Sequence, residues 1–176
     1  MQTVIPELGL LALIVALGVA LVQGTLPLFG AHRGHRAWIA VARPAAWAGG
    51  GLLAFAFLCL ATSFALNDFS VLYVAQHSNT LLPMQYRLAA TWGGHEGSLL
   101  LWALMLALWT LAVALFSRQL PDAMVARVLG VLGLVQVGFL LFILLTSNPF
   151  LRLLPAAEEG RDLNPLLQDP GLIFHP

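Results

Sequence analysis

Four apolar runs, each long enough to cross a lipid bilayer, constrain this chain more than any other feature. They lie near residues 5–29, 43–66, 97–117 and 122–147. A hydrocarbon core of about 30 Å needs about 20 residues of helix at a rise of about 1.5 Å per residue. Because lipid offers no partners to backbone amides and carbonyls, each run is predicted to be helical. The sequence therefore predicts an all-α, polytopic helical bundle in a membrane.

The composition supports this class and excludes others. Hydrophobic residues make up 60% of the chain and charged residues 9%, which is more apolar surface than one soluble core of this size can bury. Lysine is absent and eight arginines balance eight acids, so the basic footprint of a nucleic-acid-binding protein is missing. The single cysteine, Cys59, lies within an apolar run and is predicted to be a packed, unreactive side chain.

The arginines predict the direction of the crossings. Five of them fall in the connections between the first and second runs and between the third and fourth: Arg33, Arg36, Arg43, Arg118 and Arg127. Cytoplasmic loops carry an excess of basic residues, so both connections are predicted to face the cytoplasm. The segments 67–96 and 148–176 then lie on the outer side, as does the N-terminus.

The membrane runs themselves predict packing rather than chemistry. Small residues such as Gly130, Gly133 and Gly138 favour the close approach of neighbouring helices. Gln23 and Gln136 are expected to form interhelical hydrogen bonds, with a quinone or proton role for Gln136 as the alternative. Ionisable residues are missing from the middle of every run, which weighs against an ion-driven transporter.

The first outer segment predicts an amphipathic helix that lies on the outer face. Four apolar residues recur in it at helical spacing: Leu81, Met84, Leu88 and Trp92. Asn79 or Thr80 is expected to cap this helix, with Pro83 in its first turn. The apolar stripe suits either the membrane surface or a partner domain.

An unusual motif, Trp92-Gly93-Gly94-His95-Glu96, follows directly before the third run. Its paired glycines permit a close backbone approach. The His-Glu pair resembles the start of a zinc-protease motif, but the second histidine that this motif needs is replaced by Leu99. His95 is therefore expected either to hydrogen-bond local backbone at the membrane edge or to belong to a binding face.

The last residues predict the start of a fifth crossing. Asp169-Pro170 is a favourable N-cap followed by proline at the first helical position, and an apolar run follows. His175 then lies in the first turns of this helix, at the outer membrane interface.

Four stretches together resemble a known family: NDFSVLYVA, SNTLLPMQYRLAATWGGHEGSLLLW, TSNPF and EGRDLNPLLQDPGLIFHP. They are similar to the N-terminal part of the CcmF/NrfE family of cytochrome c haem lyases, which reside in bacterial inner membranes. The resemblance covers the chain from about residue 67 to its end, and its last stretch is long enough to be specific.

The resemblance implies a part of a membrane complex that takes haem from a periplasmic haem chaperone and attaches it to the CxxCH segment of apocytochrome c. It implies that His175 is a periplasmic axial ligand of the haem iron. Arg152 and Arg161 are candidate partners of the haem propionates. The motif from Trp92 to Glu96 is a candidate face for haem or for partners, which include thiol-handling subunits.

The family's tryptophan-rich segment, its second haem ligand and the histidines of its b-type haem are not in this sequence. The chain is therefore expected to be inactive alone and to need the remainder of the lyase or a companion chain. Two alternatives stay open. One is a non-catalytic assembly module that docks chaperone and apocytochrome partners, and the other is a subunit that transports haem or another solute.

Overall fold

The computed structural model describes residues 3–165. Within them the chain forms seven α-helices, and its only β-type pairing is an isolated bridge between Val71 and Arg152. The helices are α1 (Ile5–Arg33), α2 (Arg36–Ala40), α3 (Ala42–Ala65), α4 (Leu72–His77), α5 (Met84–Ala90), α6 (His95–Phe116) and α7 (Asp122–Thr146). The predicted all-α class is confirmed.

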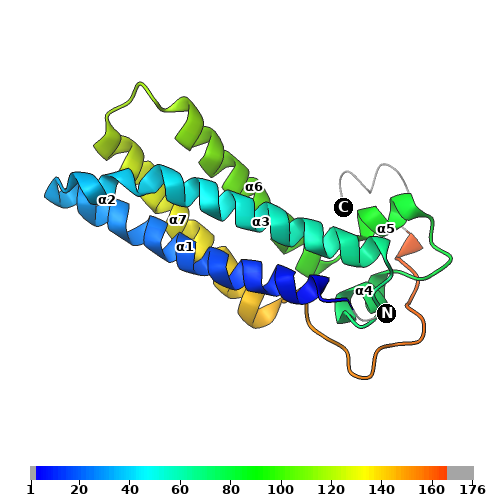
Figure 1. Cartoon of the computed structure of the whole chain (residues 1–176). Coiled ribbons are helices and arrows are strands. Elements are labelled where there is room, and N and C mark those ends of the chain that lie inside the picture. Colours follow the sequence, from blue (N-terminus) through cyan, green and yellow to red (C-terminus); the bar gives the residue numbers. More distant parts are fainter. Residues whose placement is uncertain (1–2, 166–176) are drawn as a thin grey trace.

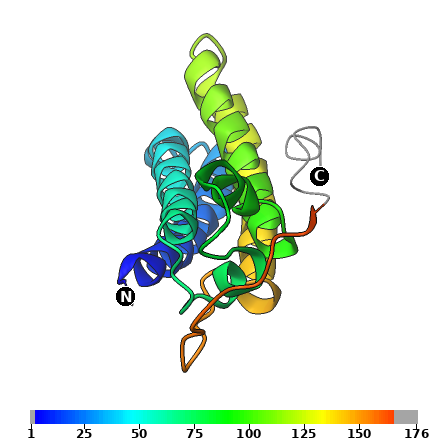
Figure 2. The same cartoon turned by 90° about the vertical axis from the view of Figure 1, so that its right-hand side faces the viewer.

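Four helical segments are long and apolar enough to cross a membrane: Ile5–Arg33, Arg36–Ala65, His95–Phe116 and Asp122–Thr146. They run side by side as a bundle (Figures 1 and 2), which confirms a multi-pass membrane protein. The first helix is longer than expected, since α1 continues to Arg33 and ends where Gly34 adopts a left-handed conformation with φ 69°. The expected connection after it contains a short helix, α2.

Small residues set the distance between α1 and α7. A Cβ atom added at Gly133 would lie 2.8 Å from the backbone nitrogen of Gly24, and one added at Gly130 would lie 2.6 Å from the Cγ atom of Leu28. A side chain at either position would push the helices apart. Gly138 differs from the expectation, because a Cβ atom there would meet nothing within 4 Å.

Residues 66–94 and 147–165 gather at one end of the bundle and are called the cap below (Figure 1). Backbone hydrogen bonds tie its two parts together: Leu72 donates to Leu151 over 2.9 Å, Leu153 to Ser70 over 2.8 Å, and Arg161 to Ala75 over 2.8 Å. The opposite end, called the arginine-rich end, carries the α1–α2 and α6–α7 connections. The described parts of the two segments predicted to lie on the outer side therefore assemble into one unit.

The helix predicted in the first outer segment is shorter than expected. α5 begins at Met84, with Pro83 in the N-cap position, and no side chain caps it. The capping prediction is wrong because the side chain of Asn79 accepts a hydrogen bond from Leu81 N at 2.9 Å instead, which forms a turn before the helix. Leu81 is 91% exposed.

Candidate functional site

Tyr73 lies at the centre of the cap. Its side chain is 2% exposed, its hydroxyl oxygen accepts a hydrogen bond from Gly94 N at 2.9 Å, and the hydroxyl donates to Ala90 O at 3.2 Å. The ring packs edge-on against Phe64 of α3, with 5.2 Å between ring centroids. Burial raises the pKa of Tyr73, and this outweighs the opposite effect of the hydrogen bond from Gly94. The hydroxyl therefore stays neutral and keeps its proton for donation.

The glycines of the Trp92-to-Ser98 stretch leave room for this tyrosine. A Cβ atom at Gly94 would lie 2.7 Å from Cε2 of Tyr73 and 2.9 Å from Nε2 of His77. One at Gly97 would overlap the carbonyl oxygen of Thr91. The sequence predicted a close approach at the pair Gly93-Gly94 but not at Gly97, and it did not identify Tyr73 as the residue that approaches. Tyr73 had no sequence signal that set it apart from the other aromatic residues of this segment, Phe69, Tyr86 and Trp92.

His95 is the first residue of α6 and ties it to the end of α7. Its Nε2 atom lies 3.0 Å from Oγ of Ser147, and its ring centroid lies 6.3 Å from that of Phe142. The expected hydrogen bond to local backbone is therefore replaced by one to a side chain 52 residues away. Glu96 follows in the first turn of α6, where a negative charge stabilises the helix N-terminus.

His77 closes the α4 side of the site. Its ring centroid lies 4.7 Å from that of Tyr73, and its Nδ1 atom lies 3.0 Å from the carbonyl oxygen of Tyr73. Because a carbonyl oxygen only accepts, Nδ1 is the protonated nitrogen, which leaves Nε2 with its lone pair in the neutral ring. His77, Tyr73 and the motif from Trp92 to Glu96 thus form one cluster.

Arg152 lies in a different part of the cap, where it joins the N-terminus to the loop after α3. Its Nε atom donates to Glu7 over 2.8 Å and its Nη2 atom to the backbone oxygen of Thr3 over 2.5 Å. Its Nη1 atom donates to the hydroxyl of Ser70 and lies 3.5 Å from the Asp68 carboxylate. All of these contacts are to the protein itself, so a propionate would have to replace Glu7.

Asp68 is the buried acid of this network, with 4% of its surface exposed. Burial by itself would raise its pKa, but hydrogen bonds from Ser70 and Thr3 together lower the pKa below its ordinary value of 3.8. The hydroxyl of Thr3 donates over 2.7 Å. Asp68 therefore remains ionised at neutral pH and holds the start of the chain against the cap.

Of the two remaining candidate residues, Arg161 lies within the described residues and His175 lies outside them. Arg161 is exposed, and its backbone amide is its link to α4. Its neighbour Glu159 accepts hydrogen bonds from the amide and hydroxyl of Thr80 at 3.0 and 2.6 Å. His175, with the Asp169-Pro170 cap and the expected fifth helix, lies outside the described residues. Among residues 3–165, no cluster of three or more His, Cys, Asp or Glu side chains could hold a metal ion.

Together these features define a class: a multi-pass helical membrane protein with an ordered polar cap at one end. Residues 92–176 match the family model described as cytochrome C assembly protein. The chain is 63% identical over 173 residues to the cytochrome c-type biogenesis protein CcmF of Pseudomonas aeruginosa, in a match that covers 98% of the chain and 26% of the relative. It is 59% identical over 172 residues to CcmF of Escherichia coli, with 97% and 27% covered.

Two further comparisons agree. The protein NrfE of Haemophilus influenzae is 46% identical over 172 residues, with 98% of the chain and 27% of the relative covered. A solved structure of the cytochrome c haem lyase CcmF matches with a TM-score of 0.77 and 28% identity, over 85% of this chain and 25% of that one. The chain belongs to the CcmF/NrfE family of cytochrome c-type biogenesis proteins. It spans about a quarter of the length of these relatives.

Proposed function

We propose that this chain supplies part of a cytochrome c haem lyase of the bacterial inner membrane, with the cap on the periplasmic side. Its family membership carries this proposal, since relatives that match nearly the whole chain are named for cytochrome c biogenesis. The solved relative is named a cytochrome c haem lyase. The arginine distribution supports the orientation, because the arginine-rich end suits the cytoplasm.

The substrate of this lyase is haem delivered by a periplasmic haem chaperone, and the acceptor is apocytochrome c. Each cysteine thiol of the CxxCH segment adds across a haem vinyl group. Sulfur bonds to one vinyl carbon and the thiol hydrogen ends on the other, so that no electrons are gained or lost. Such a reaction depends mainly on holding iron, ring and thiols in register. A b-type haem belongs to the rest of the lyase, on ligands outside this chain.

His175 is proposed as an axial ligand of the delivered haem. A neutral imidazole binds iron through one ring nitrogen while the other is oriented by a hydrogen bond. The cap supports this role because its tail, residues 147–165, is fastened to the loop helices by the backbone hydrogen bonds described above. Those bonds fix the described tail to the cap as far as Arg161, ahead of the residues that include His175.

The cluster of Trp92, Gly93, Gly94, His95 and Glu96 is proposed to form part of the face that meets haem or its protein partners. The hydrogen bonds from Gly94 to Tyr73 and between His95 and Ser147 hold this face in place. Arg161, whose side chain is exposed, is the better placed of the two candidate propionate partners. Arg152 is engaged with Glu7.

The haem spectrum of the complex tests the proposal. The chain is purified from the membrane together with the companion segment of the lyase, with His175→Ala and the matched variant His32→Ala at the arginine-rich end. We expect His175→Ala to lose the iron–histidine signature and cytochrome c maturation, and His32→Ala to keep both. An unchanged spectrum with intact maturation in His175→Ala would refute the ligand role and favour a non-catalytic docking module.

A further inference from the structure

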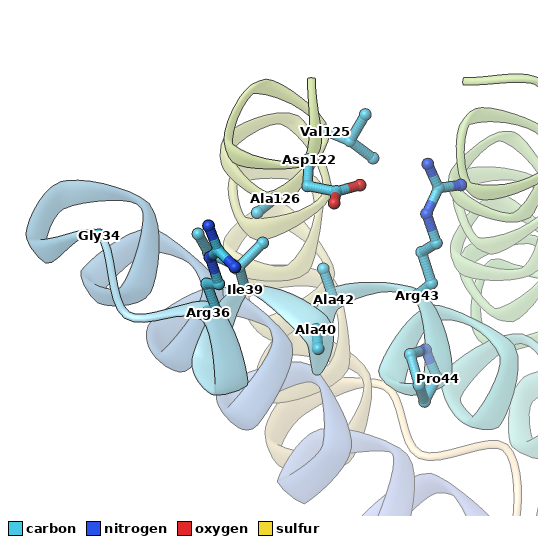
Figure 3. Close-up of a pocket in the computed structure, with 10 residues that line it drawn as sticks. All are labelled: Gly34, Arg36, Ile39, Ala40, Ala42, Arg43, Pro44, Asp122, Val125 and Ala126. Atoms are coloured by element: carbon cyan, nitrogen blue, oxygen red, sulfur yellow. The ribbon is translucent and has the colours of Figure 1, made fainter. Parts of the chain in front are cut away.

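A large pocket opens at the arginine-rich end, away from the cap. It has a volume of about 910 Å³ and lies between α2, the start of α3 and the first turns of α7. Figure 3 shows Arg36 and Arg43 on opposite sides of it, with Asp122 between them in this view. Apolar side chains, among them Ile39, Pro44 and Val125, make up much of the remaining wall. The pocket is therefore amphipathic, with three charged side chains distributed around an apolar wall.

The charges of this pocket are not neutralised by ion pairs within residues 3–165. The ion pairs found there both belong to Arg152, in the cap. Arg43 donates from Nη1 to Ala114 O and from Nη2 to Ser117 O, the latter over 3.1 Å. Each Nη atom carries a second hydrogen, so the guanidinium keeps donors for a ligand. Arg36 and Asp122 are exposed.

The helix lengths place the pocket at the depth of lipid headgroups. The part of α3 from residue 45 to Ala65 is about 31 Å long at about 1.5 Å per residue. That part alone spans a hydrocarbon core of about 30 Å. Residues 36–44, which form one wall of the pocket, then lie beyond the hydrocarbon core, in the interfacial layer.

The arrangement of charges points to a ligand with both signs. Two guanidinium groups suit a phosphate, which they bind through paired N–H donors. A carboxylate beside them repels a purely anionic headgroup but pairs with an ammonium group. The apolar wall suits the glycerol backbone and first acyl carbons that follow the phosphate. A phospholipid with a primary amine meets all three conditions.

We propose that the pocket between Arg36, Arg43 and Asp122 binds the headgroup of a zwitterionic aminophospholipid of the phosphatidylethanolamine type. The phosphate accepts hydrogen bonds from the guanidinium groups that line the pocket, and the ammonium group donates to the carboxylate of Asp122, which lies between them in Figure 3. This inference is independent of the proposed haem chemistry, since it concerns the opposite end of the bundle. Such a lipid would add to the apolar contacts that already join α2 and α3 to α7, where Ile39 and Ala42 pack with Val125.

Lipid retention measured by native mass spectrometry tests the proposal. The whole protein, extracted from its membrane and stripped of lipid, is titrated with phosphatidylethanolamine, phosphatidylcholine and phosphatidylglycerol. We expect phosphatidylethanolamine to be retained up to about fivefold more than phosphatidylglycerol, the scale of one exposed ion pair between its ammonium group and Asp122. The variant Arg36→Gln should lower phosphatidylethanolamine retention by about fivefold. Arg118→Gln, an exposed arginine that does not line the pocket, should leave retention unchanged.

The variant Asp122→Asn provides the decisive comparison. It should abolish or reverse the preference for phosphatidylethanolamine over phosphatidylglycerol, while Asp122→Glu should keep it. For each variant the measured quantity is the ratio of phosphatidylethanolamine to phosphatidylglycerol retained by the folded protein. A partial loss of folded protein therefore does not affect it. Equal retention of the lipids by the unaltered protein, or a ratio unchanged in Asp122→Asn, would overturn the proposal.

A crosslinking experiment distinguishes the lipid from other occupants. A photoreactive residue in place of Ala40, which lines the pocket, should capture phosphatidylethanolamine in the native membrane. Capture of polypeptide alone would show that protein fills the pocket and would refute lipid binding. Retention of inorganic phosphate but of no phospholipid by the stripped protein would refute it as well, since free phosphate would then be the ligand.

Discussion

The backbone amide of Gly94 donates a hydrogen bond to the hydroxyl of Tyr73 across 2.9 Å, and this contact joins α4 to the start of α6. The two residues are 21 positions apart in the sequence. The tyrosine also donates to the end of α5 through Ala90. One buried hydroxyl therefore holds three helices of the cap together, and the face from Trp92 to Glu96 depends on it.

Tyr73→Phe should destabilise the cap by about 2 kcal/mol. The half-buried amide of Gly94 loses its acceptor, and the carbonyl of Ala90 keeps only its bond from Gly93 N. The midpoint of thermal unfolding in detergent measures this loss. Tyr86→Phe is the matched control, since Tyr86 is half-buried on α5 and its hydroxyl makes no hydrogen bond within residues 3–165. An equal effect of the two substitutions would contradict the role of the Tyr73 hydroxyl.

Gly94→Ala should prevent the close approach of α4 and α6, because its Cβ atom would press on the Tyr73 ring. We expect reduced yield of folded protein and loss of cytochrome c maturation. Gly18→Ala on α1 is the control, because a Cβ atom there meets nothing within 4 Å. Combining Gly94→Ala with Tyr73→Leu, which removes the ring edge, should recover part of the folded yield. No recovery would indicate that the glycine is required for another reason.

Arg152→Gln should destabilise the contact between α1 and the cap by about 2 kcal/mol, the scale of hydrogen bonds to charged groups. The substitution removes the pair with Glu7 at 2.6 Å and leaves the buried Asp68 with fewer partners. Thermal unfolding measures the loss. Arg161→Gln, at an exposed position of the same tail, should change stability by less than about 0.5 kcal/mol. If Arg152→Gln leaves stability unchanged but weakens haem binding, the propionate role is the correct one.

The stability of the cap should fall in acid. The pKa of Asp68 is lower in the folded protein than its ordinary value, so its contribution is complete above about pH 4 and is lost as the pH falls through the folded pKa. Intrinsic fluorescence during heating, recorded between about pH 6 and pH 3, measures this change. Asp68→Asn should remove much of the dependence. Glu159→Gln should have little effect, although hydrogen bonds from Thr80 and Gly160 also lower the pKa of Glu159, because that residue is exposed.

The two glutamines inside the bundle should respond oppositely to substitution by leucine. Gln23 donates to Leu129 O over 2.8 Å, so Gln23→Leu should destabilise by about 1 kcal/mol. Neither polar atom of the Gln136 side chain finds a partner within residues 3–165, so Gln136→Leu should be neutral or stabilising. The midpoint of thermal unfolding in detergent compares the stabilities of the two variants. A marked loss of stability in Gln136→Leu would indicate an additional partner, such as a water molecule in the small cavity of about 20 Å³ beside it.

Features that depend only on residues close together in the sequence could be predicted from it. The length of each apolar run sets whether it crosses a bilayer, and the α-helical class follows because lipid cannot satisfy a bare backbone. The requirement for glycine at Gly94 could likewise be anticipated from the motif. The helix around Met84 was predicted with the wrong start, because the Asn79 side chain forms a turn with Leu81 that competes with a cap.

The partners of the polar side chains were decided only by the tertiary structure. Arg152 contacts Thr3 across 149 positions and Ser147 lies 52 positions from His95, and periodicity within a short window carries no information about pairs so far apart. The sequence alone establishes that this chain is a helical membrane protein of the CcmF/NrfE type. The partners that its loops bring to Tyr73 and Arg152 depend on how the four crossings pack, because that packing brings distant donors and acceptors within hydrogen-bonding distance.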